Sequence, residues 1–129
     1  MYATISADIV SSTSLCIEET IALKQRIEDL FSVLEKRFPG FWGRLIKGDY
    51  IECLLPSAKD GFRVALIIKS CIKSFPIAEP KKKKLFQAYG IRIAMGIGNM
   101  RIVDKEHGIM DGEAIYLSGR TLSGMGAPN

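Results

Sequence analysis

The sequence predicts an α+β fold in which two amphipathic helices alternate with short β-strands. The first observation is a β-branched apolar run at residues 4–10, followed by a Ser/Thr cluster, as expected for a buried strand that leads into a helix. The second is the helical spacing of apolar side chains over residues 15–38 and again over residues 62–75. The third is a pair of apolar runs separated by Lys47-Gly48-Asp49, a spacing that predicts a β-hairpin.

The boundaries of these elements follow from the residues that flank them. Pro39-Gly40 ends the first helix, because proline cannot continue a helix and glycine favours its C-terminal cap. The hairpin strands are expected at residues 41–46 and 50–55. Ser57 is expected to cap the second helix, with Asp60 three residues later in a capping-box position, and Pro76 ends that helix.

The last third of the chain predicts one more strand pair and a final helix. Residues 89–97 are rich in Ile and Met, and the glycines and Asn99 that follow indicate a turn into a strand at residues 100–103, as a hairpin or a bulged pair. Residues 104–112 are expected to form a polar loop. A helix is expected at residues 114–122, with an acidic residue near its positive N-terminal end.

The order strand, helix, strand, strand, helix, strand predicts a ferredoxin-like βαββαβ sandwich, whose sheet carries both helices on one face. In that topology the end of the first strand lies beside the hairpin turn, so the carboxylates of Asp8 and Asp49 are expected to be neighbours. Adjacent carboxylates repel each other unless a cation neutralises them, which points to a metal or phosphate site. Asp49 has a simpler explanation as a turn residue, whereas Asp8 must be solvent-facing, salt-bridged or metal-bound.

Composition narrows the class of protein. With 129 residues, 47% hydrophobic and 25% charged, the chain is expected to form a single globular domain at residues 1–129. No apolar run approaches the roughly 20 residues of a membrane helix, and the first ten residues do not resemble a signal peptide. We therefore expect a cytoplasmic protein with no membrane partner.

Cysteine, histidine and lysine offer weaker signals. Cys16, Cys53 and Cys71 share no metal-ligand spacing, so they are expected to be buried or half-buried thiols, and the single histidine, His107, is expected to be exposed. The run Lys81-Lys82-Lys83-Lys84 contributes much of the net charge of +4 and is predicted to form a solvated loop tip. Nucleic-acid binding by this run is an open alternative.

Four segments carry motifs that resemble the catalytic domain of class III nucleotidyl cyclases. The segment Asp8-Ile9-Val10-Ser11-Ser12-Thr13 is similar to the family's first strand, and Gly48-Asp49 to the hairpin with its second metal aspartate. Residues 92–98 keep the arginine and last glycine of a later strand, and residues 112–120 are similar to a helix motif that ends in arginine. The first and last of these segments also resemble small bacterial cyclase-like proteins of the SatD type.

The resemblance implies a function for several residues. Asp8 and Asp49 would hold two Mg²⁺ or Mn²⁺ ions, assisted by the backbone carbonyl of Ile9. Arg92 would contact the β- or γ-phosphate of a nucleoside triphosphate or a related phosphate ligand. Arg120 would come from the second protomer of a head-to-tail homodimer and stabilise charge at the α-phosphate. The amides that would favour the triphosphate are those of Ser11, Ser12 and Thr13.

Other family positions are changed. Leu45 falls at the position of the family's purine-selecting lysine, and Ile109 at its second base-reading position, commonly aspartate, although Asp111 is close. Tyr116 replaces the transition-state asparagine. Two functions therefore stay open: a divergent nucleotidyl cyclase, or a non-catalytic nucleotide-sensing and dimerisation module of a bacterial regulator with a C-terminal helix-turn-helix. The chain ends soon after the last helix, where the family continues. We expect an N-terminal domain of a longer protein, whose missing region would carry any nucleic-acid binding.

Overall fold

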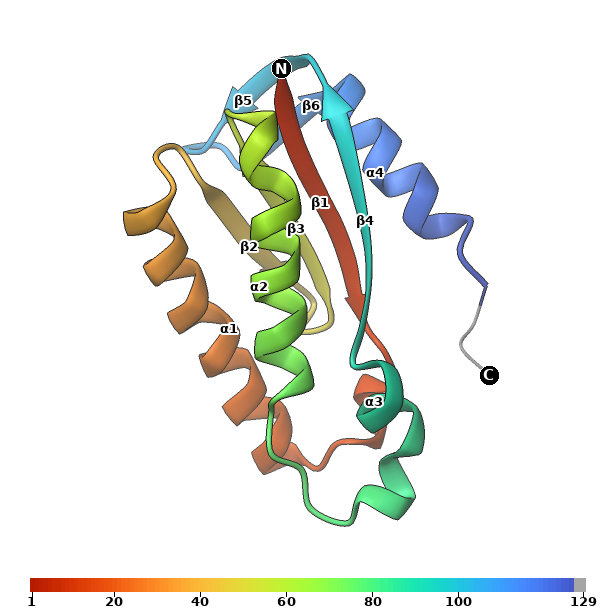
Figure 1. The fold of residues 1–129 in the computed structure, drawn as a ribbon. Helices are drawn as coiled ribbons and strands as arrows, with labels where there is room; N and C mark the ends of the chain where they lie inside the picture. Colours follow the sequence, from red (N-terminus) through yellow and green to blue (C-terminus); the bar gives the residue numbers. More distant parts are fainter. Residues whose placement is uncertain (127–129) are drawn as a thin grey trace.

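The computed structural model describes residues 1–126 and contains a four-stranded antiparallel sheet with helices on both faces (Figure 1). The sheet has the order β2-β3-β1-β4, so β1 is central and pairs with both β3 and β4. Together with two long helices, this order confirms the predicted ferredoxin-like βαββαβ arrangement. The strands are β1 (Tyr2–Ile9), β2 (Trp42–Ile46), β3 (Tyr50–Leu55) and β4 (Ile91–Gly98).

The main core lies between the sheet and two helices, α1 (Ile17–Arg37) and α2 (Gly61–Lys73). Side chains alternate along a strand, so every second residue of β1 faces this core: Ala3, Ile5 and Ala7 are each 0% exposed. The apolar stripe of α1 meets them with buried residues at helical spacing, which are Leu23, Ile27, Phe31 and Leu34. The two predicted helices therefore lie on one face, as expected.

A third helix, α4 (Glu113–Ser123), covers the opposite face of β1 and β4 (Figure 1). Buried hydroxyls join it to β1, because Thr4 Oγ1 donates to Ser118 Oγ at 3.0 Å and Ser6 Oγ lies 2.8 Å from the same atom. The backbones of α4 and β4 also approach closely at Gly96, where an added Cβ would lie 2.1 Å from the Ala114 carbonyl oxygen. The central strand is thus buried on both faces.

The predicted pairing in the last third of the chain is wrong. β5 (Met100–Asp104) does not pair with β4, but forms a separate two-stranded sheet with β6 (Ile109–Gly112), which lies within the predicted polar loop. A tight turn explains this pairing, because Asp104 accepts hydrogen bonds from the backbone amide of His107, at 3.0 Å, and binds its ring. As expected, His107 is exposed.

The start of α2 also differs from the prediction. Ser57 precedes a short 3₁₀ helix, η2 (Ala58–Asp60), and makes no capping hydrogen bond with its side chain. α2 begins at Gly61, which touches the sheet: an added Cβ would lie 2.7 Å from both Ala3 Cβ and Met95 Sδ. Close packing of glycine, rather than a serine cap, therefore defines the start of this helix.

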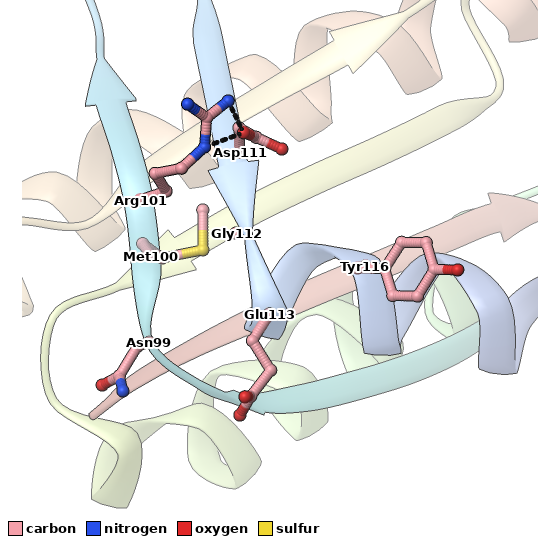
Figure 2. Close-up of a pocket in the computed structure, with 7 residues that line it drawn as sticks. All are labelled: Asn99, Met100, Arg101, Asp111, Gly112, Glu113 and Tyr116. Carbon is pink, nitrogen blue, oxygen red and sulfur yellow. Dashed lines mark hydrogen bonds and ion pairs between the residues drawn. The ribbon is translucent and has the colours of Figure 1, made fainter.

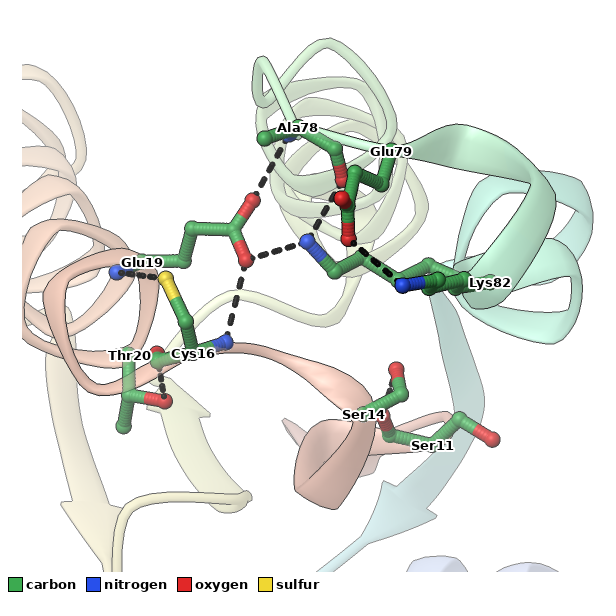
Figure 3. A network of polar contacts seen from close by, with 9 residues as sticks. Ser11, Ser14, Cys16, Glu19, Thr20, Ala78, Glu79 and Lys82 are labelled. Atoms are coloured by element: carbon green, nitrogen blue, oxygen red, sulfur yellow. Dashed lines mark hydrogen bonds and ion pairs between the residues drawn. The ribbon is translucent and has the colours of Figure 1, made fainter.

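The lysine run is not simply a solvated loop tip. It forms a 3₁₀ helix, η3 (Pro80–Lys83), that continues into α3 (Lys84–Tyr89). Only 7% of Lys83 is exposed, and its ammonium donates to Glu19 Oε1 at 2.7 Å and to the Ala78 carbonyl at 2.5 Å. Figure 3 shows the Glu19 carboxylate of this network pointing toward Ala78. An ion pair and hydrogen bonds therefore hold the lysine run against the first turn of α1.

The three cysteines occupy different environments. Cys16 is exposed, contrary to expectation, and caps α1: its sulfur accepts from the Glu19 amide at 3.4 Å while its own amide donates to Glu19 Oε1 at 3.0 Å. Cys53 is buried and Cys71 half-buried, and burial raises the pKa of both thiols.

Among the helices of residues 1–126, none combines the length and apolar character needed to cross a membrane.

The Glu19–Lys83 pair predicts a loss of stability in acid. The Lys83 ammonium, helped by the amides of Cys16 and Ala78, lowers the pKa of Glu19 from an ordinary 4.5 to about 2. Because the folded-state pKa is depressed, the stabilisation is complete above pH 4.5 and is lost as the pH falls towards 2. Glu19→Gln should lower the melting temperature at pH 7, and the difference from the parent should shrink in acid.

Circular-dichroism melts between pH 2 and 7 measure this effect. The matched control is Glu28→Gln, whose partner Lys24 lies 4.0 Å away with both side chains more than half exposed. The control should melt like the parent throughout. A constant difference between Glu19→Gln and the parent across the whole pH range would contradict the assignment.

The close contact between α4 and β4 predicts opposite effects for two glycine substitutions. Gly96→Ala forces a methyl group against the Ala114 carbonyl, and we expect it to cost about 1–3 kcal/mol of stability. Gly119→Ala places the same methyl group on α4 where no described atom lies within 4 Å, and should stabilise by about 0.5–1 kcal/mol. Urea unfolding measures both, and a neutral Gly96→Ala would contradict the docking of α4.

Candidate functional site

A pocket lies at the end of β1, where the strand meets the β2–β3 turn and α3. It is lined by Asp8, Ile9, Val10, Ser11, Asp49, Leu85 and Arg92. The topology that brings them together is the predicted one: Asp8 is opposite Tyr50 in the β1–β3 register, and the Ile9 amide donates to the Asp49 carbonyl at 2.9 Å. Asp8 and Asp49 therefore lie at one pocket.

The Asp8 carboxylate already has a positive partner. Arg92 stands directly opposite it in the β1–β4 register, and donates from Nε to Oδ1 at 2.9 Å and from Nη2 to Oδ2 at 2.5 Å. The pair is partly shielded, since 26% of the Asp8 side chain and 29% of that of Arg92 are exposed. Asp8 raises the pKa of Arg92, chiefly through these hydrogen bonds. Of the options for Asp8, the structure therefore contains the salt bridge.

Arg92 also contacts the segment that follows α4. Its Nη1 donates to the carbonyl oxygens of Met125, at 3.3 Å, and Gly126, at 3.2 Å. Every nitrogen of the guanidinium is thus engaged by the protein. Arg92 is expected from the sequence to contact phosphate, but in this structure it links β1 to the segment after α4.

The backbone turns sharply beside the pocket. Ser11 has a left-handed conformation, with φ of 52°, and lines the pocket directly before the 3₁₀ helix η1 (Ser12–Ser14). Ser12 and Thr13 follow it in that helix and are not among the lining residues. Of the three residues whose amides are expected to favour a triphosphate, only Ser11 lines the pocket.

The oxygen donors of this pocket fit a hard cation only in part. Asp8 and Asp49 supply two carboxylates, which suits Mg²⁺ or Mn²⁺ bound together with ligand phosphate oxygens and water. Within residues 1–126 no group of three or more acidic, cysteine or histidine side chains could hold a metal. The residues therefore fit a metal shared with a phosphate ligand, rather than a metal enclosed by protein alone.

Arg120 lies on α4 outside this pocket. Its guanidinium stacks over the ring of Tyr116, 4.6 Å from the ring centroid, and both side chains are exposed. The chain does not bring Arg120 to its own Asp8 and Asp49 pocket. Its expected place in the site of a second protomer stays a prediction.

A second pocket lies between the β5–β6 sheet and the start of α4 (Figure 2). Its wall includes the ion pair of Arg101 and Asp111, in which Nε lies 2.8 Å from Oδ2, and the exposed ring of Tyr116. In the β1–β4 register this pocket is at the Tyr2 end of β1 and the Asp8 pocket is at the other end. The two pockets are thus separated by the length of the strand.

The positions that the resemblance associates with base reading are divided between core and surface. Leu45 packs against the main core, Ile109 is 44% exposed, and Asp111 is paired with Arg101. Sequence reasoning missed Leu85 of α3 as a wall residue of the Asp8 pocket. No local signal pointed to it, because contacts between residues distant in sequence help to position α3, among them the pair of Lys83 and Glu19.

Comparison with solved structures identifies the fold as that of class III nucleotidyl cyclase catalytic domains. The guanylyl cyclase domain of a rhodopsin fusion protein from the aquatic fungus Blastocladiella emersonii has a TM-score of 0.66 at 17% identity, over 98% of this chain and 76% of that one. The corresponding domain from Catenaria anguillulae, in complex with GTP, has a TM-score of 0.61 at 17% identity, over 98% and 74%.

A third similar structure is the catalytic core of a rhodopsin-guanylyl cyclase with converted specificity, in complex with ATPαS. Its TM-score is 0.65 at 19% identity, over 98% of this chain and 73% of that chain. No protein-family profile and no curated protein sequence matches the chain. Identities this low carry the fold alone, and the likeness to SatD-type proteins stays a prediction.

Proposed function

We propose that this domain binds a nucleoside triphosphate together with a divalent metal at the Asp8 and Asp49 pocket. The observation that carries the proposal is the meeting of Asp8, Asp49 and Arg92 at one strand end, in a chain with the fold of nucleotidyl cyclases. Two of the similar structures hold GTP or ATPαS. The two carboxylates and one guanidinium supply the charges that a metal-bound triphosphate requires.

Each residue has a distinct task in this proposal. Asp8 and Asp49 hold Mg²⁺ or Mn²⁺, with the carbonyl of Ile9 beside them, while Arg92 binds a phosphate oxygen. Ser11 lies at the pocket wall, where its backbone amide would donate to a phosphate oxygen. The metal, when bound, neutralises phosphate charge and lowers the pKa of an attacking hydroxyl.

For catalysis we propose a head-to-tail homodimer in which Arg120 of one protomer reaches the pocket of the other. Arg120 is exposed on α4 and lies outside the pocket of its own chain. Its guanidinium would stabilise the charge that develops on the transferred phosphorus, as arginines do in other phosphoryl transfers. The activity would be that of a divergent nucleotidyl cyclase.

A non-catalytic nucleotide-sensing and dimerisation module is the second candidate. It is favoured by Leu45, which packs against the core, and by Tyr116, whose ring holds Arg120 in a stacked arrangement. Both candidates bind nucleotide and metal, and they differ in turnover. Assays for cyclic product with each of the four triphosphates and Mn²⁺ separate them, because only the cyclase yields a product that Asp49→Ala abolishes.

Calorimetric titration tests the binding site. With Mn²⁺ present, we expect Asp49→Asn to weaken triphosphate binding by about tenfold or more, because one of two metal-binding carboxylates is lost. The matched control is Asp29→Asn, which removes the same charge from the exposed surface of α1. Equal binding by parent and Asp49→Asn, or no binding of any of the four triphosphates to the parent, would overturn the proposal.

Mixing two variants tests the shared site. Asp49→Ala and Arg120→Ala should each be inactive, while an equal mixture should recover about a quarter of the parent activity, because half the dimers are mixed and each has one intact site. Cyclic-product formation before and after mixing is the measurement. Full activity of Arg120→Ala alone would exclude the head-to-tail site.

A further inference from the structure

We propose that Arg92 is an internal counter-ion of Asp8, which makes metal binding conditional on the simultaneous arrival of a polyphosphate. The inference rests on the proposed function, since the ligand is the same metal-bound triphosphate. It adds an exchange of ion-pair partners to that function. Arg92 pairs with Asp8 while the pocket holds no ligand, and it pairs with phosphate instead when metal and phosphate bind together.

The geometry of the pair is the starting point. Arg92 meets both Asp8 oxygens in a fork, at 2.9 and 2.5 Å, and its remaining nitrogen donates to the carbonyls of Met125 and Gly126. A planar guanidinium that contacts both oxygens of a carboxylate is the strongest geometry available to an arginine. Asp8 is therefore neutralised by the protein itself.

A metal ion that arrives alone meets two obstacles. The Asp8 oxygens already accept from Arg92, so inner-sphere coordination requires the fork to open. The ion also approaches the positive charge of Arg92. Besides Asp8, the only acidic side chain that lines the pocket is Asp49. Because like charges repel strongly in a partly shielded site, metal alone should bind weakly.

A polyphosphate that arrives alone meets the converse obstacle. Arg92 can bind it only by leaving Asp8, which would then face Asp49 and the phosphate charges without a cation. When both arrive together, the metal replaces Arg92 at Asp8 and the phosphate replaces Asp8 at Arg92, so every charge keeps a partner. Each ligand then increases the affinity for the other, and thermodynamic linkage requires the two increases to be equal.

The inference predicts that one substitution acts in opposite directions on two ligands. Arg92→Gln frees Asp8, so Mn²⁺ alone should bind about tenfold more tightly than to the parent. The same variant lacks the phosphate partner, so Mn²⁺ with inorganic tripolyphosphate should bind about tenfold more weakly. Electron paramagnetic resonance counts free Mn²⁺ in the first titration, and calorimetry follows the second.

Two further variants and a control make the experiment specific. Arg101→Gln removes an arginine from another cross-strand pair, that with Asp111, which lies outside this pocket, and should change neither affinity. Asp8→Asn combined with Arg92→Gln should lose the gain in Mn²⁺ affinity. Arg92→Lys keeps the charge but not the fork, so its gain should be smaller, and thermal melts establish that each variant is folded.

The outcomes separate this inference from the proposed function. Tighter Mn²⁺ binding by Arg92→Gln, lost again in the double variant, supports the counter-ion role. If folded Arg92→Gln and Arg92→Lys bind Mn²⁺ no more tightly than the parent, the inference is wrong. If the parent binds neither tripolyphosphate nor any nucleoside triphosphate with Mn²⁺, the proposed function fails, and the exchange proposed here fails with it.

Discussion

Burial of β1 on both faces is the constraint on which the rest of this structure depends. On one face Ala3, Ile5 and Ala7 pack against α1 and α2, and on the other Thr4 and Ser6 lie under α4, all of them 0% exposed. Hydroxyls can be buried there because Ser118 of α4 satisfies them, and no buried side-chain polar atom of residues 1–126 lacks a hydrogen-bond partner. The strand therefore positions the helices on both sides of the sheet.

This constraint explains where the pocket forms. Asp8 continues the alternation of Thr4 and Ser6, but it lies at the strand end, where it is partly exposed. A carboxylate is tolerated there because Arg92 stands opposite it in the register, whereas two residues earlier it would lie beneath α4. The candidate site thus lies at the end of β1 where, after the buried Thr4 and Ser6, this face of the strand becomes partly exposed.

Local pattern was sufficient for part of this arrangement. The spacing of apolar residues predicted both long helices and the β2–β3 hairpin, and the topology then brought Asp8 to the same pocket as Asp49. What the pattern missed depends on contacts distant in sequence or on turn chemistry. Lys83 is buried by Glu19, 64 residues earlier, and β5 pairs with β6 because Asp104 closes the turn between them. The partner of Arg92 was missed for the same reason, since opposite charges on separate strands pair only once the register is known.

The two halves of the expected nucleotide site differ in how the fold supports them. The phosphate half lies on β1, β4 and the β2–β3 turn, which the central strand holds together. The base half is distributed over the edge strand β2 and the separate β5–β6 sheet. At Leu45, a lysine would place an ammonium against the apolar core, which costs stability unless a partner is supplied. A lysine at this position would therefore lower stability, which agrees with the proposal that this domain recognises a nucleotide mainly through its phosphates.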